Sequence, residues 1–238
     1  MNHAGIEAIL LDKDGVLLDF QKTYGFATRK IITRLSGGDD AILSALARAV
    51  GFSLCDNSIR ADSPLVAGHA AHFCGIWAGV LGIENRKELH DNVDLMYKAL
   101  TEKEAVLIDG VGDVLDILHA DYRIGIATND TEDCARAQLA NKDMVHHLDF
   151  LAGYDSGYGA KPGTGMALAF CKAMQLAPGQ IIMVGDSVHD MTFARDAGMT
   201  AVGIATGPLP IEELAPHADH CIDGLGELPD LLLKLQAA

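Results

Sequence analysis

The strongest constraint on the fold is a repeated alternation of short apolar runs with segments of helical spacing. The apolar runs occupy residues 8–11, 124–127, 150–152, 181–184 and 201–204. Helical patterns lie between the later runs, at residues 131–139, 166–174 and 188–197. A strand that is buried on both faces reads as a continuous apolar run, and helices connect parallel strands. The alternation therefore predicts an α/β fold in which helices cover both faces of a parallel sheet.

The long block between the first and second apolar runs has a different spacing of apolar residues. Residues 21–104 show helical spacing, with Asp39 and Asp40 as possible caps. Ser63 followed by proline predicts the start of a helix that continues through residues 65–83. We therefore expect an inserted all-helical domain at residues 21–104 and an α/β core made of residues 1–20 and 105–238.

Charge and cysteine content narrow the possible partners and the compartment. The chain carries 33 Asp and Glu residues against 18 Lys and Arg, a formal net charge of −15, which argues against affinity for nucleic acid or an anionic membrane. Its five cysteines form no CxxC pair and are odd in number, as is typical of reduced thiols in a cytoplasmic protein. We expect no signal peptide, and no apolar segment of the sequence is long enough to span a bilayer. We expect a cytoplasmic monomer or homodimer.

Polar side chains follow the apolar runs at the places where the predicted strands end. They are Asp12 and Asp14 after the first run, Thr128 and Asn129 after the second, Asp186 and Asp190 after the run at 181–184, and Lys161 ahead of a helix. In an open parallel sheet, ligands bind beyond the carboxyl ends of the strands. Carboxylates gathered there need a cation, and Mg²⁺ prefers hard oxygen ligands together with water and substrate phosphate. A magnesium ion and Lys161 would also allow an anionic substrate to approach an acidic protein.

Each of these elements has a plain structural alternative. Asp-x-Asp-Gly is a common turn, the Thr128 segment is a common N-cap, and Lys161 before proline is usually a solvated loop residue. Their joint placement on successive strand ends favours a functional site instead. His189 is more typical of an ordinary first-turn residue, and His69 is more typical of a packing or surface residue than of a metal ligand.

Four motifs in this order resemble those of the haloacid dehalogenase superfamily of phosphotransferases. They are DKDGV at residues 12–16, Thr128-Asn129, Lys161-Pro162 and GDSVHD at residues 185–190. The helical insert after the first motif looks like the cap of the branch that includes phosphoglycolate phosphatases and β-phosphoglucomutases. The resemblance implies a Rossmann-like parallel sheet core with an inserted helical cap. One departure is Asp109-Gly110, where family members commonly have Pro-Gly.

The resemblance implies roles for the two aspartates of the first motif. Asp12 would be the nucleophile that attacks phosphorus and forms an aspartyl-phosphate, which splits one difficult displacement into two easier ones. Asp14 would protonate the leaving alcohol and then deprotonate the hydrolytic water. Both residues would also contact the metal, Asp14 through its backbone carbonyl. No role is attached to Lys13, which lies between them.

The remaining motifs would hold the cofactor and the phosphoryl group. Mg²⁺ is the implied cofactor, with Asp186 as a direct ligand and Asp190 as a ligand or as an acid that positions metal-bound water. The Thr128 hydroxyl, the Asn129 backbone amide and the Lys161 ammonium would receive the phosphoryl oxygens.

The function that the resemblance implies is Mg²⁺-dependent hydrolysis of a small soluble phosphomonoester, of which 2-phosphoglycolate is one candidate. A phosphomutase of the β-phosphoglucomutase type is the main alternative, and it would need the cap to return a bisphosphate intermediate rather than admit water. A signalling module that keeps its phospho-aspartate and a binding protein without turnover are alternatives of another class. The cap would close as a lid over a small phosphorylated metabolite. Lys22, Arg60 and His69 are the cap residues that we expect to contact it.

Overall fold

The computed structural model describes residues 5–68 and 70–237 and contains a six-stranded parallel sheet. The strands lie in the order β3-β2-β1-β4-β5-β6. Their bounds are β1 (Ala8–Leu11), β2 (Arg123–Ala127), β3 (Phe150–Ala152), β4 (Ile181–Gly185), β5 (Thr200–Ile204) and β6 (His220–Ile222). β1 lies between β2 and β4, and Leu11 is in register with both Ile126 and Val184. The carboxyl ends of these three strands therefore meet where the chain switches from one side of β1 to the other, which is where open α/β sheets bind ligands.

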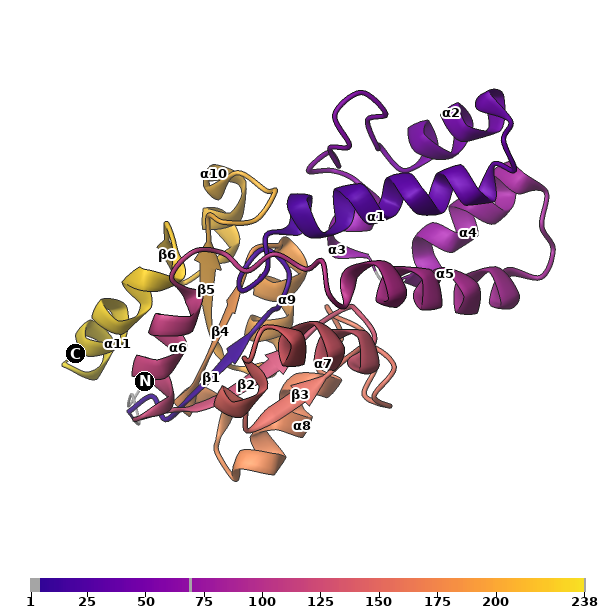
Figure 1. Cartoon of the computed structure of the whole chain (residues 1–238). Helices are drawn as coiled ribbons and strands as arrows, with labels where there is room; N and C mark the ends of the chain where they lie inside the picture. Colours follow the sequence, from indigo (N-terminus) through magenta and orange to yellow (C-terminus); the bar gives the residue numbers. More distant parts are fainter. Residues whose placement is uncertain (1–4, 69, 238) are drawn as a thin grey trace.

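Helices cover the sheet and also build a second domain beside it (Figure 1). The core contains α6 (Val111–His119), α7 (Glu132–Asn141), α8 (Gly165–Met174), α9 (Val188–Ala197), α10 (Ile211–Leu214) and α11 (Leu228–Gln236), with the 3-10 turns η1 (Val145–His147), η2 (Pro178–Gln180), η3 (Ala215–His217) and η4 (Leu225–Glu227). The second domain contains α1 (Phe20–Leu35), α2 (Asp40–Ala49), α3 (Pro64–Ala67), α4 (Ala70–Leu81) and α5 (Arg86–Thr101). Within the described ranges, no helix is both long enough and apolar enough to cross a membrane.

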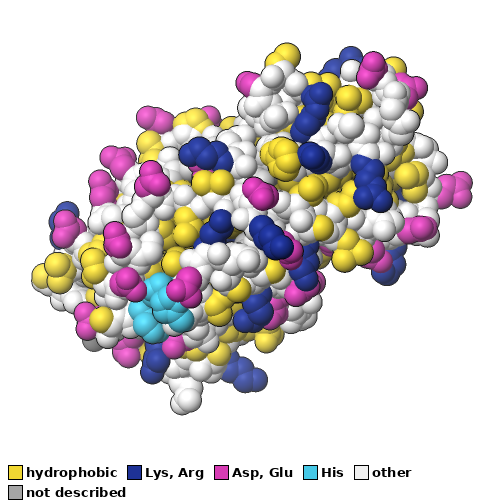
Figure 2. Space-filling view, in the orientation of Figure 1, with side chains coloured by type: hydrophobic (Ala, Val, Ile, Leu, Met, Phe, Trp, Pro, Cys, Tyr) yellow, Lys and Arg dark blue, Asp and Glu magenta, His cyan; other side chains and the backbone are white. Residues whose placement is uncertain are grey.

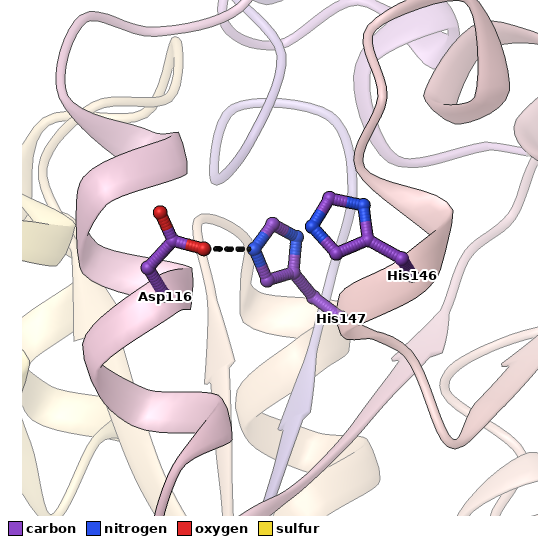
Figure 3. A group of neighbouring side chains, drawn as sticks. All are labelled: Asp116, His146 and His147. Carbon is purple, nitrogen blue, oxygen red and sulfur yellow. Dashed lines mark hydrogen bonds and ion pairs between the residues drawn. The ribbon is translucent and has the colours of Figure 1, made fainter.

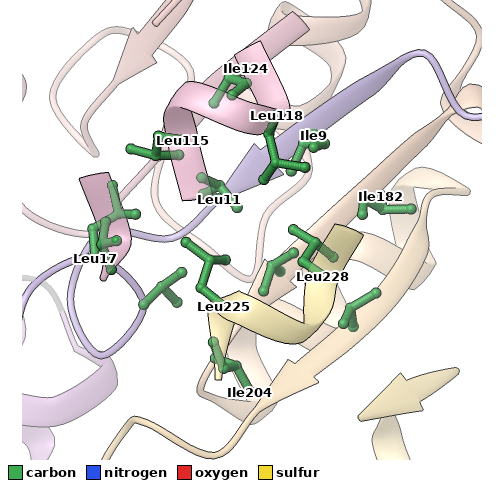
Figure 4. Packing of buried hydrophobic residues seen from close by; sticks show 14 of the residues in the cluster. Ile9, Leu11, Leu17, Leu115, Leu118, Ile124, Ile182, Ile204, Leu225 and Leu228 are labelled. Atoms are coloured by element: carbon green, nitrogen blue, oxygen red, sulfur yellow. The ribbon is translucent and has the colours of Figure 1, made fainter. Parts of the chain in front are cut away.

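Alternate residues of β1 join different hydrophobic clusters on the two faces of the sheet. Ile9 packs in one cluster with Leu118 of α6 and Leu228 of α11 (Figure 4). Leu10 belongs to the other cluster, which includes Phe170 of α8. All four residues of β1 are buried because helices cover both faces. This double burial is the reason that the strand reads as a continuous apolar run.

The inserted helices have a hydrophobic core of their own. Trp77 of α4 is fully buried, and its ring centroid lies 5.2 Å from that of Phe73 in an edge-to-face arrangement. The indole N–H of Trp77 donates a hydrogen bond of 3.3 Å to the Leu46 carbonyl. A separate core makes the insert a domain, so the predicted fold class is confirmed. The predicted boundaries at 20/21 and 104/105 stay a prediction.

The segment after Ser63 differs from the predicted single helix. Ser63 caps α3 as expected, but Gly68 is extended (φ −82°, ψ 151°) and α4 begins only at Ala70. A Cβ atom at residue 68 would lie 2.4 Å from the carbonyl oxygen of Pro64, so this approach of two backbone segments requires glycine. The prediction of one helix over residues 65–83 was wrong, because it treated Gly68 as an ordinary helical position.

The five predicted strands are confirmed, each to within one residue at its ends. β6 was not predicted, because it is a three-residue edge strand whose middle residue, Cys221, is exposed. All five cysteines are free thiols, of which Cys55 and Cys221 are exposed. The helix caps predicted at Asp39 and Ser63 are also confirmed, whereas Asp40 is the first residue of α2 and not its cap.

Replacing Leu118 by Ala should lower the free energy of unfolding by about 2–5 kcal/mol, because a cavity would remain between α6 and the sheet. Leu118 is 1% exposed, whereas its neighbour Ile117 on the same helix is 60% exposed. Ile117→Ala is therefore the matched control and should change the unfolding free energy by less than about 0.5 kcal/mol. Urea denaturation followed by circular dichroism measures both values. Equal losses in the two variants would contradict this packing.

Candidate active site

Three aspartates come together where β1 and β4 end. Asp12 follows β1, Asp186 follows β4, and Asp190 lies in the first turn of α9. All three are buried, and one carboxylate oxygen of each lies within 4.8 Å of the other two. Lys161 compensates part of this charge, since its Nζ donates to Asp12 Oδ1 at 2.7 Å and to Asp190 Oδ1 at 2.6 Å. One lysine among three buried carboxylates leaves an excess of negative charge.

Asp186 receives no hydrogen bond from any described residue, although it is only 6% exposed. The backbones of two glycines pack against its carboxylate. A Cβ atom added at Gly15 would lie 2.0 Å from Asp186 Oδ2, and one added at Gly207 would lie 1.9 Å from the same oxygen. In the described part of the chain, Oδ2 of Asp12 also lacks a donor. Buried carboxylate oxygens without donors form an oxygen-only ligand set, which fits a hard divalent cation such as Mg²⁺.

Burial shifts the pKa values of this cluster. Burial, followed by the charges of Asp12 and Asp190, raises the pKa of Asp186 well above its usual value. Burial likewise raises the pKa of Asp12 to about 7, although the Lys161 ammonium acts in the opposite direction. For Lys161, burial acts to lower the pKa, but the two carboxylates that it contacts outweigh burial and raise it. Lys161 therefore stays charged, while the carboxylates need a further cation to ionise together.

The residues predicted to bind phosphate line the same pocket as these aspartates. Thr128, Asn129 and Lys161 all contribute to its wall, and His189 does so as well. The side chain of Asn129 holds the Lys161 backbone, because Oδ1 accepts from its N–H at 2.8 Å and Nδ2 donates to its carbonyl at 3.1 Å. Thr131, not Thr128, is the N-cap of α7. His189 lies in the first turn of α9, as expected, and it also lines this pocket.

Lys13, to which no role was assigned from sequence, lies at the centre of a second polar cluster. Its side chain is fully buried, and Nζ donates to Asp14 Oδ1 at 2.9 Å and to Asp130 Oδ2 at 3.0 Å. The same Nζ donates to the Tyr24 hydroxyl at 2.9 Å and to Gln138 Oε1 at 2.5 Å. Burial raises the pKa of Asp14, and the charge of Lys13 acts against that increase. Lys13 therefore fixes the position of the Asp14 carboxylate and favours its ionised form.

The helical domain contacts the core around this pocket. Tyr24 of α1 donates to Asp130 Oδ2 at 2.9 Å, and Tyr154, which follows β3, donates to Asp94 Oδ2 of α5 at 2.7 Å. The described residues that this domain contributes to the pocket wall are Phe20, Tyr24, Thr28, Ile59, Leu65, Val66, Gly68, Ala70, Phe73, Asp94 and Tyr97. Hydroxyl groups and apolar side chains thus dominate this wall.

Two of the three cap residues expected to contact a substrate do not line the pocket. The Lys22 side chain is 69% exposed and lies 2.7 Å from the Asp19 carboxylate. The Arg60 side chain is 67% exposed and lies 2.7 Å from the Asp62 carboxylate. The expectation was wrong for Lys22 and Arg60, because each pairs with a nearby acid in solvent. His69 lies outside the described residues.

Lys13→Met should lower the free energy of unfolding by about 2–4 kcal/mol, because it leaves two partly buried carboxylates without their shared, fully buried cation. The pKa of Asp14 should rise further, since the charge that lowers it is removed. Urea denaturation and carboxyl ¹³C NMR titration measure the two effects. Lys172→Met, at an exposed site on α8, is the control and should change neither value. A Lys13→Met protein as stable as the wild type would contradict the role of this cluster.

The raised pKa of Asp12 predicts a pH-dependent stability in the absence of a divalent cation. A carboxyl group whose pKa is 3.8 when unfolded and about 7 when folded stabilises the protein below the unfolded value and loses that contribution as pH rises through the folded value. In EDTA, the wild type should therefore lose stability between about pH 4 and pH 7 relative to Asp12→Asn, and Mg²⁺ should restore it. Urea denaturation across this range measures the difference. Parallel pH profiles for the two proteins would contradict the assignment.

The chain matches a family model described as haloacid dehalogenase-like hydrolase over residues 6–198. Phosphoglycolate phosphatase from Salmonella typhimurium is 30% identical over 115 residues, which cover 48% of this chain and 46% of that protein. The chain therefore spans about half the length of this curated relative.

Solved structures share the architecture over nearly the whole chain. A predicted phosphoglycolate phosphatase from Haemophilus somnus has a TM-score of 0.74 at 18% identity and covers 95% of this chain and 97% of its own. β-Phosphoglucomutase from Clostridium difficile has a TM-score of 0.68 at 17% identity and covers 98% of this chain and 97% of its own. At these identities the likeness shows the fold alone. The family model covers most of the chain, and the protein therefore belongs to the haloacid dehalogenase-like hydrolase family.

Proposed function

We propose that this protein is a Mg²⁺-dependent phosphatase that hydrolyses a small phosphomonoester through an aspartyl-phosphate on Asp12. The observation that carries the proposal is the pairing of Asp12 with Lys161. Lys161 holds Oδ1 of Asp12 at 2.7 Å, and Oδ2 accepts no hydrogen bond from the described residues. One oxygen is thus fixed by a cation while the other remains available to attack phosphorus.

Several groups around Asp12 would position the phosphoryl group. The Lys161 ammonium, the Thr128 hydroxyl and the Asn129 backbone amide would receive its oxygens, since all three residues line the pocket with Asp12. Phosphoryl transfer requires mainly positioning and charge stabilisation from the protein. The two hydrogen bonds between the Asn129 side chain and the Lys161 backbone support this role, because they hold the segment that carries the lysine.

Asp14 would transfer the protons of the reaction. It would donate a proton to the leaving alcohol oxygen and afterwards accept one from the water that attacks the aspartyl-phosphate. Burial raises the pKa of Asp14, which suits a group that must first act as an acid. Lys13 limits this increase in the pKa of Asp14, so that the carboxylate can act as a base after it has given up its proton.

Asp12, Asp186 and Asp190 would hold Mg²⁺, together with the backbone carbonyl of Asp14. When bound, this ion would supply the positive charge that balances the phosphoryl oxygens and the carboxylates. Within the cluster, Asp190 is also fixed by Ser187, whose Oγ donates to Asp190 Oδ2 at 2.5 Å. This contact supports a role for Asp190 in orienting its neighbours as much as in binding the ion.

The domain at residues 21–104 would act as a cap that excludes water from the reaction. Its contacts through Tyr24 and Asp94 support closure over the pocket, because both residues bond to the core and line the pocket. The substrate would be a small phosphorylated metabolite. 2-Phosphoglycolate is one candidate, since several curated relatives are phosphoglycolate phosphatases.

Phosphate release from a panel of small phosphomonoesters, with and without Mg²⁺, tests the proposal. Asp12→Asn should abolish release, and Asp14→Asn should lower its rate by about 10²–10⁴-fold. Asp113→Asn, at an exposed acid on α6, is the control and should leave release unchanged. Release that persists in Asp12→Asn would contradict the proposal. Phosphorylation of Asp12 without any release would favour a phosphomutase or a signalling role.

A further inference from the structure

A second group of potential metal ligands lies on the core domain, on α6 and η1. Asp116 belongs to α6, and His146 and His147 form the end of η1 (Figure 3). One ligand atom of each residue lies within 4.8 Å of those of the other two. In the space-filling view, histidine side chains form one patch with acidic side chains at its edge (Figure 2). None of these three residues lines the pocket at the strand ends, so this group is a separate feature.

The ring of His147 is held from both sides by oxygen atoms. It is 2% exposed, its Nδ1 lies 3.3 Å from the Met144 carbonyl oxygen, and its Nε2 lies 2.7 Å from Asp116 Oδ1. A neutral imidazole donates from only one of its nitrogens, so it leaves a lone pair facing the second oxygen. When Nδ1 donates to the carbonyl, that lone pair is on Nε2 and faces the carboxylate. Ligating histidines are commonly oriented by such a backbone hydrogen bond on the opposite nitrogen.

His146 brings a second imidazole to the same place. Its ring centroid lies 3.9 Å from that of His147, and the planes are tilted by 36°. Its Nδ1 is 3.6 Å from the carboxylate of Asp143, in an exposed pair. In the described part of the chain its Nε2 accepts or donates no hydrogen bond. The cluster therefore offers two imidazole nitrogens and one carboxylate, with further negative charge beside it.

We propose that Asp116, His146 and His147 form a binding site for a borderline divalent transition-metal ion, with Zn²⁺ as the representative ion. A cation between His147 Nε2 and Asp116 Oδ1 would satisfy both atoms, and His146 would complete three protein ligands. Two imidazoles and a carboxylate suit Zn²⁺, whereas Mg²⁺ prefers oxygen ligands. The two clusters of this protein therefore differ in the ion that they select. The bound ion would connect α6 to the turn that leads into β3.

Calorimetric titration of the full chain with Zn²⁺, in excess Mg²⁺, tests this site. One equivalent should bind, and its affinity should fall at least about tenfold in His146→Ala and in Asp116→Asn. Both substitutions are at exposed side chains, so folding should be preserved. His217→Ala, at an exposed histidine of η3, is the matched control and should bind Zn²⁺ as the wild type does.

A second variant separates this site from the strand-end cluster. Asp186→Asn should still bind one equivalent of Zn²⁺ with the affinity of the wild type, because Asp186 belongs to the oxygen-only cluster. Co²⁺ in place of Zn²⁺ should give the visible absorption of a nitrogen-ligated ion in the wild type and in Asp186→Asn, and His146→Ala should lose it. Wild-type affinity in His146→Ala and Asp116→Asn would overturn the proposal. Loss of this equivalent in Asp186→Asn alone would also overturn it, since the ion would then belong to the strand ends.

Discussion

The concentration of buried carboxylates at the ends of parallel strands is the constraint on which the rest of this structure depends. A charge buried without a partner is strongly unfavourable. This protein nevertheless buries several carboxyl groups within a chain of net charge −15. Two buried lysines compensate part of it, each shared by two acids. Lys161 bonds to Asp12 and Asp190, and Lys13 bonds to Asp14 and Asp130. The remaining excess of oxygen ligands lies at Asp186, where the backbone of two glycines makes room for it.

Lys13 connects this electrostatic arrangement to the position of the helical domain. Its ammonium contacts Asp14 on the core side and the Tyr24 hydroxyl of α1 on the other. Gln138 extends the same network, since its Nε2 donates at 2.7 Å to Thr101 Oγ1 at the end of α5. A movement of the helical domain that withdraws Tyr24 changes the hydrogen bonds of Lys13. The environment of Asp14 is therefore coupled to the position of this domain, because one continuous and largely buried hydrogen-bond network joins them.

Much of the core could be predicted from sequence because buried parallel strands leave a clear pattern. The run Ala8–Leu11 is apolar because both of its faces are covered, and the polar residues after it mark the edge where ligands bind. Other features left weaker signals. The break at Gly68 depends on a contact with the Pro64 carbonyl, and β6 is too short to show periodicity.

The side-chain partners of the site were the least predictable part. Lys13 is a charged residue inside an apolar stretch, which is a signal of burial, but its partners come from positions as distant as Gln138. The cap residues expected at the pocket were chosen for their charge. Charge is a poor guide there, since Lys22 and Arg60 pair with neighbouring acids in solvent, while tyrosines and apolar residues face the pocket. No regular spacing in the sequence predicts tertiary contacts of this kind.

The proposed reaction depends on Asp12 acting as the nucleophile of the strand-end cluster. The most direct measurement is acid quenching of a reaction with substrate and Mg²⁺, followed by mass spectrometry of the peptide that contains Asp12. We expect one phosphoryl group on Asp12 in the wild type. Turnover that releases phosphate while Asp12 is never phosphorylated would contradict this expectation.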